Sequence, residues 1–179
     1  PDLICFAKGV NSGYVPLGGV LISAEIAATF DERPFPGGLT YSGHPLACAA
    51  AVASMEVIDD EGVLAHARAL GADVLGPRLA EMAERHPSVG EVRGLGVFWA
   101  IELVRDPDTR EPLVPFAASG ADTAPLQQVV AACKERGVLP FSAGNRLHIV
   151  PPCTTPTDVL ADGLDRIDDA LSVADGLVA

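Results

Sequence analysis

The sequence predicts an α/β fold in two parts, with a boundary near residue 60. Before this point, two short apolar runs flank a glycine-rich stretch and are followed by helical patterns, which is typical of an α/β domain. After it, amphipathic helices flank pairs of apolar runs that are joined by glycine turns. We therefore expect a piece of an α/β domain over residues 1–60 and a compact α+β domain over residues 61–179.

The first part begins with a short apolar run at residues 3–7 that ends at Lys8. A run of this length and composition predicts a buried strand, which would bring the lysine to the edge of a sheet. Proline is favoured at the first position of a helix, so Pro45 marks a helix start. The further elements expected here are a buried strand over 18–23, a short helix over 24–30, a loop over 31–40 and a helix from Pro45 to just before Gly62.

The second part begins with a long amphipathic helix over about residues 63–85, which His86-Pro87 should end. The last helix is expected from Thr157 onward, with its apolar residues inward and its acidic residues outward. Between these helices we expect strands over 89–94 and 97–103, a loop over 106–119, a helix over 125–136, and strands over 138–141 and 146–150.

Charge and composition exclude several classes of function. The 24 acidic and 12 basic residues give a net charge of −12, which repels nucleic-acid phosphates and anionic membrane surfaces. No apolar run approaches the ~20 residues of a membrane span, and the first residues lack the charged and apolar regions of a signal peptide. The four cysteines have no C-x-x-C spacing for a metal, so we expect no metal site and mostly buried, reduced thiols in the cytoplasm.

Lys8 is the first candidate for chemistry. A lysine is usually a solvated surface residue, and that alternative stays open for any single lysine. Lys8 differs because it ends an apolar strand between Ala7 and Gly9. Ligands of open α/β sheets bind at the carboxyl ends of strands. A desolvated amine there would be neutral and able to attack an aldehyde.

Four blocks of the sequence, in order, resemble those of class III aminotransferases. The first surrounds Lys8, the second surrounds Thr40, and the other two lie in the second part of the chain. They cover nearly the whole chain, which makes chance agreement improbable. The blocks are Pro1-Asp2-Leu3 with Ala7-Lys8-Gly9, Gly13-Tyr14 and Pro16-Leu17-Gly18-Gly19; Thr40-Tyr41-Ser42-Gly43-His44-Pro45 with Ala47-Cys48-Ala49-Ala50; Arg93-Gly94-Leu95-Gly96; and residues 146–152.

The resemblance implies a partial fold type I transferase that depends on pyridoxal 5'-phosphate (PLP). Residues 1–60 would be the remainder of the large PLP-binding domain, and residues 61–179 the C-terminal small domain. Lys8 would form the Schiff base with PLP and act as acid and base during transamination. Thr40 would contact the PLP phosphate of the neighbouring subunit, which implies a homodimer with the cofactor site at the subunit interface. The alternative for Thr40 is that it only stabilises a turn.

The resemblance also places substrate recognition in the segment before Pro151-Pro152. Many relatives carry an arginine three residues before the paired prolines, where this chain has His148. Alternation along a strand puts Arg146 and His148 on one face and Leu147 and Ile149 on the other. Arg146 would therefore bind the keto-acid carboxylate, with His148 as a weaker, pH-sensitive donor. The alternative is that Arg146 forms a surface ion pair.

The predicted activity is transfer of an amino group from an amine or ω-amino acid donor to an α-keto acid. Other chemistries share the lysine and the threonine in this fold, so a decarboxylase, racemase, aminomutase or lyase stays open. The family's remaining PLP contacts would lie before residue 1, and none is found in this sequence. A non-catalytic, truncated fragment that serves packing and dimerisation is therefore a third possibility.

Overall fold

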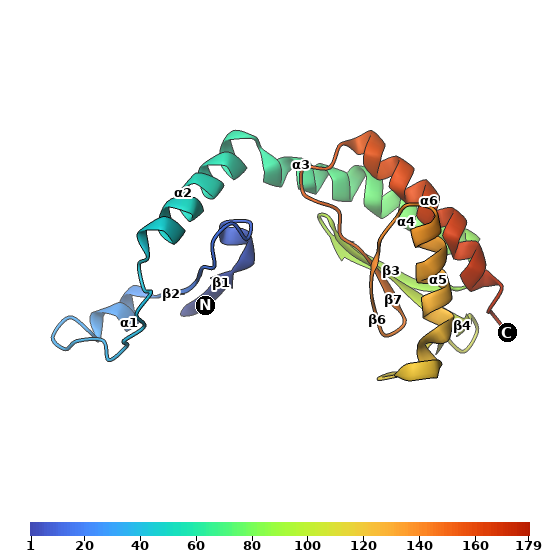
Figure 1. Cartoon of the computed structure of the whole chain (residues 1–179), viewed down its shortest axis with the longest axis horizontal. Coiled ribbons are helices and arrows are strands. Elements are labelled where there is room, and N and C mark those ends of the chain that lie inside the picture. The colour runs from blue at the N-terminus through green and yellow to red at the C-terminus, as the bar shows by residue number, and fades with distance from the viewer. The chain divides into compact units, whose positions relative to one another are not determined.

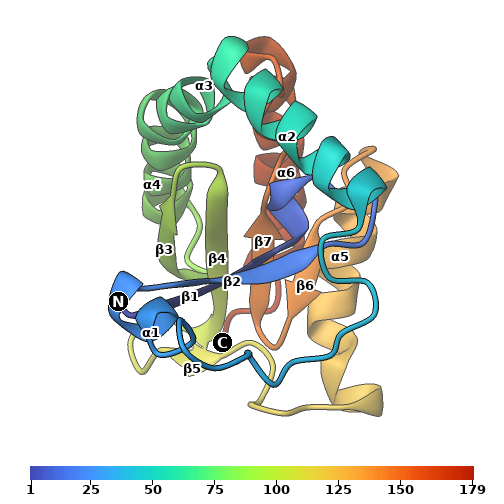
Figure 2. The ribbon, with the colours of Figure 1, turned by 90° about the vertical axis from the view of Figure 1, so that its left-hand side faces the viewer.

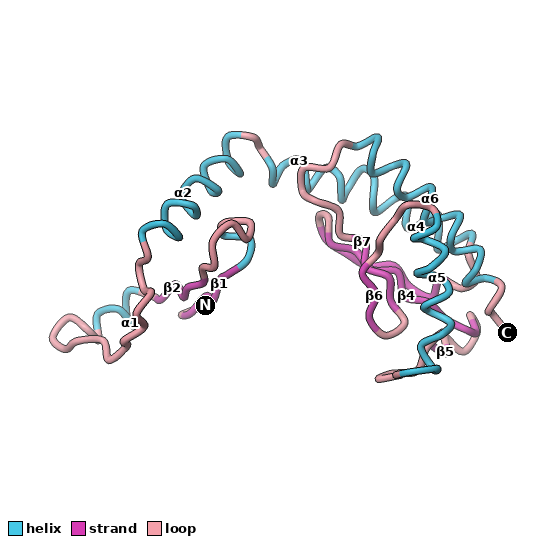
Figure 3. Tube along the Cα trace, viewed as in Figure 1, coloured by secondary structure: helices cyan, strands magenta, loops and turns pink.

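A computed structural model describes all residues, 1–179, and divides them into two compact units, Pro1–Gly62 and Val63–Ala179. The first unit contains two strands, two α-helices and a single 3₁₀ turn (Figure 1). The strands pair antiparallel, with Leu3 opposite Ile22 and Ala7 opposite Gly18 (Figure 3). Its elements are β1 (Leu3–Ala7), η1 (Lys8–Val10), β2 (Gly18–Ile22), α1 (Ala24–Ala28) and α2 (Pro45–Asp60).

The prediction that β1 and β2 are buried is wrong for this chain. Every residue of β1 is exposed, and Leu3 and Leu21 keep 56% and 59% of their surface accessible. The physical reason is that the two strands pair with each other only, so no third strand extends the sheet and no helix covers either face. Successive side chains point to opposite faces, so apolar residues are exposed on both faces.

Helix α2 forms where the sequence predicts it. Pro45 occupies its first turn, and Gly62, with a φ of 62°, follows its last turn in the left-handed conformation that favours glycine. Ala47 and Ala51 are its buried residues, spaced one turn apart on one face of the helix.

The second unit is an antiparallel sheet with helices on one face. Its sheet runs in the order β3-β4-β7-β6, as Figure 2 shows, and the short β5 pairs with β4. The elements are α3 (Val63–Ala69), η2 (Leu70–Leu75), α4 (Gly76–Arg85), β3 (Val89–Leu95), β4 (Phe98–Asp106), β5 (Glu111–Pro112), η3 (Gly120–Thr123), α5 (Ala124–Glu135), β6 (Phe141–Ala143), β7 (Arg146–Ile149) and α6 (Thr157–Asp175).

The hydrophobic core lies between this sheet and its helices. Ile101 and Leu103 of β4 and Leu147 of β7 are fully buried, and they pack with Leu79 of α4 and Leu171 of α6. Fully burying such a side chain contributes roughly 1.5–3 kcal/mol. The inward residues of α6 that the sequence predicts, Leu164 and Ile167 among them, do form part of this core.

Three elements differ from the prediction. The long helix expected over 63–85 contains a π-helical segment, η2, in which Gly71 packs directly against the backbone of Gly96. The strand expected over 138–141 begins only at Phe141, since Pro140 has no N–H to donate to a ladder. Finally, the predicted loop 106–119 contains β5, which continues the sheet beside β4.

The cysteines also differ from the prediction, because three of them lack a covering element. Cys133 is buried between α5 and α6, whereas Cys5, Cys48 and Cys153 are exposed. All four are free thiols. No helix of the chain has the length and apolar character to cross a membrane.

Candidate functional site

Lys8 lies where β1 passes into η1, in an unusual backbone conformation. Its φ is 53°, in the left-handed region that costs a non-glycine residue roughly 1–2 kcal/mol. The side chain is exposed, so the prediction of a desolvated lysine is wrong for this chain, because nothing covers the sheet beside it. Backbone strain of this kind is enriched at functional sites, but Ser12, Arg110 and Ala117 adopt the same conformation, so it does not by itself distinguish Lys8.

The turn after Lys8 is held by a buried asparagine that the sequence did not single out. Asn11 is 1% exposed, and its side chain donates to the carbonyl of Val15 and accepts from the N–H of Gly13 at 3.2 Å. Gly13 itself has a φ of 80°, which an L-residue rarely adopts. The Asn-Ser-Gly sequence is typical of such a turn and could have revealed this role.

Thr40 is exposed and lies five residues before the start of α2. Backbone bonds of its neighbours close the surrounding turns, from Ser42 N to Leu39 O at 3.0 Å and from His44 N to Tyr41 O at 3.2 Å. The Thr40 hydroxyl takes part in neither bond. The Nδ1 atom of His44, directly before the helix, is buried and has no hydrogen-bond partner. Together with the unpaired first N–H groups of α2, this segment suits an anion such as a phosphate.

The second candidate region is the sheet face of the second unit that no helix of that unit covers. Strand register places Arg93, Ala100, His148 and Phe141 side by side across β3, β4, β7 and β6. A hollow of about 470 Å³ lies on this face. Its lining residues are Arg93, Gly94, Leu95, Phe98, Ala100, Arg146 and His148.

Arg146 is the guanidinium on this face that has no counter-ion of its own. Its Nε donates to the carbonyl of Ala143 at 3.4 Å, and the group forms none of the ion pairs found in this unit. By contrast, Arg93 Nη1 lies 2.8 Å from Glu102 and 3.4 Å from Glu91. Arg146 therefore does not form the surface ion pair that was the alternative to substrate binding.

Glu102 lies between the two arginines. It is opposite Arg146 in the β4–β7 ladder and accepts a hydrogen bond from Arg93. That hydrogen bond and the charges of Arg93 and Arg146 hold the pKa of Glu102 below its ordinary value, although burial opposes the shift. Glu102 is thus an anion that pairs directly with Arg93 and acts on Arg146 through its charge alone, without forming an ion pair with it.

His148 is enclosed by aromatic rings. Its ring centroid lies 6.0 Å from that of Phe98 and 5.2 Å from that of Phe141, and its Nε2 is buried without a partner. Burial lowers the pKa of His148, and the positive charges of Arg146 and Arg93 lower it further. The imidazole is therefore neutral near pH 7.

The structure brings Arg146 and His148 together, while Leu147 and Ile149 turn into the core, as alternation along the strand predicts. It provides no hydrogen bond between Lys8 and Thr40, which lie in the first unit. Glu102 and Phe98, which is 61% exposed, are not among the site residues that the sequence predicts. The signal was present: Phe98, Ala100 and Glu102 alternate with Trp99, Ile101 and Leu103, so a charged residue shares the face of Phe98.

Comparison with known proteins identifies the family. A family model described as "Aminotransferase class-III" matches residues 1–171. The chain is 36% identical over 179 residues to the 4-aminobutyrate aminotransferase of Escherichia coli, covering 97% of this chain and 38% of that protein. It is 37% identical over 153 residues to the putrescine–pyruvate aminotransferase of Pseudomonas aeruginosa, covering 85% of this chain and 32% of that protein. The chain thus spans little more than a third of the length of the curated relatives it matches.

Solved structures agree with the sequence relatives. The taurine:2-oxoglutarate aminotransferase of Bifidobacterium kashiwanohense, in complex with PLP and glutamate, matches with a TM-score of 0.91 and 36% identity over 100% of this chain and 39% of that one. An (S)-enantioselective omega-transaminase from Thermomicrobium roseum matches with a TM-score of 0.81 and 36% identity, covering 97% and 38%. The resemblance and the partial fold type I architecture predicted from sequence are confirmed. The chain belongs to the class III aminotransferase family.

Proposed function

We propose that the chain is part of a PLP-dependent transaminase that moves an amino group from an amine or ω-amino acid to an α-keto acid. The observation that carries this proposal is Lys8: an exposed amine at the end of β1, on a strained backbone, inside the block that resembles the family's lysine segment. In this proposal residues 1–60 are the remainder of the large PLP-binding domain, and residues 61–179 are the small domain.

Lys8 and Thr40 are the residues that would hold the cofactor. Lys8 Nζ would attach it covalently, and its exposed, unpaired amine fits this role. Thr40 and the first turn of α2 would bind the phosphate, and the free Thr40 hydroxyl and the unpartnered His44 Nδ1 fit an anion. When bound, PLP supplies an electron sink for the substrate carbon. Once displaced by the amine substrate, Lys8 Nζ would accept and return the proton of that carbon.

Arg146 would bind the carboxylate of the keto acid. Its guanidinium has free N–H groups, no ion-pair partner, and a place in the wall of the hollow on the open sheet face. A guanidinium can bind a carboxylate through two parallel hydrogen bonds, which also orients it. His148, neutral beside it, would be a weaker donor whose contribution grows as it becomes protonated.

The amino donor would carry a terminal primary amine. The relatives named above act, by their names, on 4-aminobutyrate, putrescine and taurine, each of which ends in such a group. We further infer a homodimer with the cofactor site at the subunit interface, on the role of Thr40 that the resemblance implies. A cytoplasmic location is compatible with three exposed, unpaired thiols.

The test is to express the complete reading frame that contains these 179 codons, supply PLP, and locate the cofactor by borohydride reduction and peptide mass spectrometry. We expect the label on Lys8, loss of label and turnover in Lys8→Ala, and retention of both in Lys134→Ala. Lys134 is the matched control because it is the chain's other lysine and lies exposed at the end of α5. A label on Lys134 would refute the assignment.

A half-reaction separates transamination from the other chemistries of this fold. With stoichiometric enzyme and 4-aminobutyrate as the amine donor, a transaminase forms one equivalent of the corresponding aldehyde and needs a keto acid to continue. A decarboxylase, racemase, aminomutase or lyase would turn over its substrate without any keto acid, and that result would overturn the proposed reaction while leaving Lys8 in place.

A further inference from the structure

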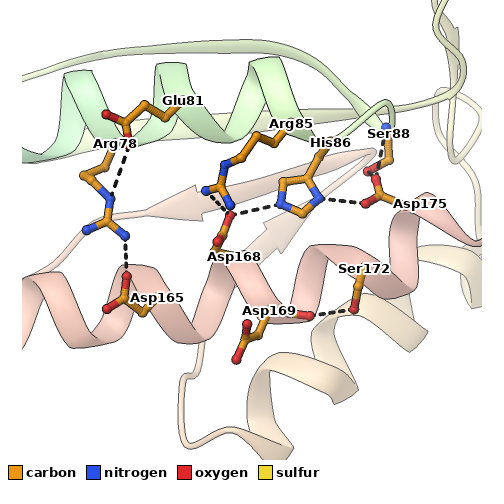
Figure 4. Close-up of polar contacts among 10 residues, drawn as sticks. All are labelled: Arg78, Glu81, Arg85, His86, Ser88, Asp165, Asp168, Asp169, Ser172 and Asp175. Carbon is orange, nitrogen blue, oxygen red and sulfur yellow. Dashed lines mark hydrogen bonds and ion pairs between the residues drawn. The ribbon is translucent and has the colours of Figure 1, made fainter.

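A line of charged side chains joins α4 to α6 in the second unit, where the two helices lie side by side (Figure 4). Arg78 of α4 pairs with Asp165 of α6, and Arg85 Nη2 lies 2.7 Å from Asp168 Oδ1. Near the end of this line, His86 follows the last residue of α4 and points toward α6. His86 is not among the residues that line the hollow on the open sheet face.

Both ring nitrogens of His86 meet a carboxylate. Nδ1 lies 2.7 Å from Asp175 Oδ2, and Nε2 lies 2.9 Å from Asp168 Oδ1. The imidazole is largely buried, with 12% of its side chain exposed, and the two carboxylates are 25% and 17% exposed. Contacts of this length and burial are stronger than those of an exposed pair, because water screens them less.

The geometry determines the protonation state of the ring. An ionised carboxylate can only accept hydrogen bonds, so a neutral imidazole, which has one N–H, could satisfy one of the two acids. Each carboxylate also accepts hydrogen bonds from other donors. Arg85 donates to Asp168, and Ser88 donates to Asp175 Oδ1 through its hydroxyl at 2.7 Å and its N–H at 3.3 Å. His86 is therefore present as the imidazolium.

The direction of the pKa shift of His86 agrees with this protonation state. Burial lowers the pKa of His86, but the hydrogen bonds to Asp175 and Asp168 outweigh it and raise the pKa above its ordinary value of 6.5. Burial acts to raise the pKa of Asp168, while the hydrogen bonds from His86 and Arg85 lower it.

We propose that His86 is a structural proton-binding site, and that its proton latches the turn between α4 and β3 onto α6. The charged groups that face the ring are Asp168 and Asp175 of α6, with Arg85 of α4 sharing Asp168. Ser88 extends the latch into the sheet, because its carbonyl accepts from Val104 N of β4 at 2.8 Å. The proton thus ties the last turn of α4, the entry to β3 and the end of α6 together.

The sign of the pH dependence follows from linkage. The folded chain holds this proton more tightly than the unfolded chain, so the stabilisation is fully present below pH 6.5. It is lost as pH rises through the higher pKa of the folded state. Each pKa unit of difference multiplies the folding constant by about ten.

The experiment is urea unfolding of the 179-residue chain between pH 6 and pH 9.5, followed by the fluorescence of Trp99, at a protein concentration low enough that light scattering detects no oligomers. Trp99 is the chain's single tryptophan and lies in β4, so the signal reports the second unit. We expect the folding constant of the wild type to fall relative to that of His86→Gln as pH rises across this range. Asp168→Asn and Asp175→Asn should each reduce that pH dependence.

Asp169→Asn is the matched control, because Asp169 is the next residue on α6 and its carboxylate forms no ion pair with α4. It should leave the pH dependence unchanged. A second measurement does not require the variants of the latch to fold: ring NMR signals of the wild-type chain, with His86 assigned by elimination from single substitutions of the other three histidines. Identical pH profiles for wild type and His86→Gln, or a His86 ring that is neutral at pH 7, would overturn the proposal.

Discussion

Lys8 and Arg146 are among the six of the chain's twelve lysines and arginines that form no ion pair. Arg93, by comparison, is neutralised by Glu102 and Glu91. A paired cation must first exchange its partner before it binds an incoming anion, whereas an unpaired one is already available. At the scale of single residues, the absence of an ion pair leaves Lys8 and Arg146 available for a ligand, and their positions at the end of β1 and on the open sheet face set them apart from the other unpaired cations.

The role of Arg146 predicts a specific kinetic change. Arg146→Ala should raise the KM for the keto acid and leave covalent attachment of the cofactor intact, because the proposed role of this arginine is to bind the acceptor carboxylate. The loss should correspond to roughly 1.5–3 kcal/mol, the usual contribution of a charged hydrogen bond. Steady-state kinetics of the full reading frame measure it. If Arg146→Ala leaves the keto-acid kinetics unchanged while His148→Ala impairs them, the carboxylate binds to His148 instead.

His148 predicts a pH dependence of stability opposite in sign to that of His86. Burial and the nearby arginines depress the pKa of His148 in the folded state, so below pH 6.5 the unfolded chain takes up the proton first. Stability should therefore fall on acidification below pH 6.5 and be unaffected by this residue above it. Urea unfolding at pH 5 and pH 7.5 should show a smaller acid loss in His148→Gln than in the wild type. An equal loss in both chains would show that His148 is already protonated when folded.

At the scale of secondary-structure elements, the π-helical segment η2 between α3 and α4 lies very close to the backbone of the β3–β4 turn. A Cβ atom added to Gly71 would lie 2.2 Å from the carbonyl oxygen of Gly96. This contact is with backbone, so no side-chain rotation can relieve it. The π-helical segment and the β3–β4 turn are consequently packed together at a distance that a larger residue does not allow.

Two glycine substitutions test this packing against helix propensity. Gly71→Ala should destabilise the second unit by about 1–3 kcal/mol, because the backbone must shift to admit a methyl group. Gly163→Ala, in α6, should instead stabilise it by about 0.4–1 kcal/mol, since nothing lies within 4 Å of the added Cβ. Urea unfolding followed by Trp99 fluorescence measures both. Equal changes in the free energy of unfolding for the two substitutions would show that the backbone at Gly71 and Gly96 can move apart at little cost.

At the scale of the whole molecule, the two units differ in how well they bury apolar surface. The second unit has a continuous core of nineteen buried residues, seventeen of them from its helices and strands and two, Leu113 and Val114, from the segment after β5. The first has a two-stranded sheet with apolar side chains exposed on both faces, and no more than Ala47 and Ala51 buried in α2. Unpaired strand edges and large exposed apolar patches promote association.

The 179-residue chain alone should therefore self-associate and bind PLP poorly. We expect light scattering to detect oligomers at micromolar concentration, and a hydrophobic dye to bind. Leu21→Lys, which places a charge on an exposed position of β2, should reduce both signals. Leu126→Lys, at a buried position of α5, is the contrasting variant and should unfold the second unit instead. A monodisperse chain that melts cooperatively and binds PLP tightly would contradict this expectation.

Local patterns in the sequence were enough to predict features that depend on a single helix or strand. Proline chemistry predicts the start of α2 at Pro45, and the structure agrees. Helix periodicity predicts the inward residues of α6. Strand alternation separates Arg146 and His148 from Leu147 and Ile149. The family also followed from short blocks of residues, because such blocks are read along the chain and need no contact between distant segments.

The tertiary structure decided what depends on partners far apart in the chain. The bonds of His86 to Asp168 and Asp175 join residues 82 and 89 positions apart, and no local pattern specifies such a pairing. The neutralisation of Arg93 by an ion pair depends on Glu102 in the next strand. The exposure of Lys8 depends on what covers the β1–β2 sheet. The physical reason is that periodicity determines which way a side chain points, whereas burial and charge neutralisation depend on which other element it meets.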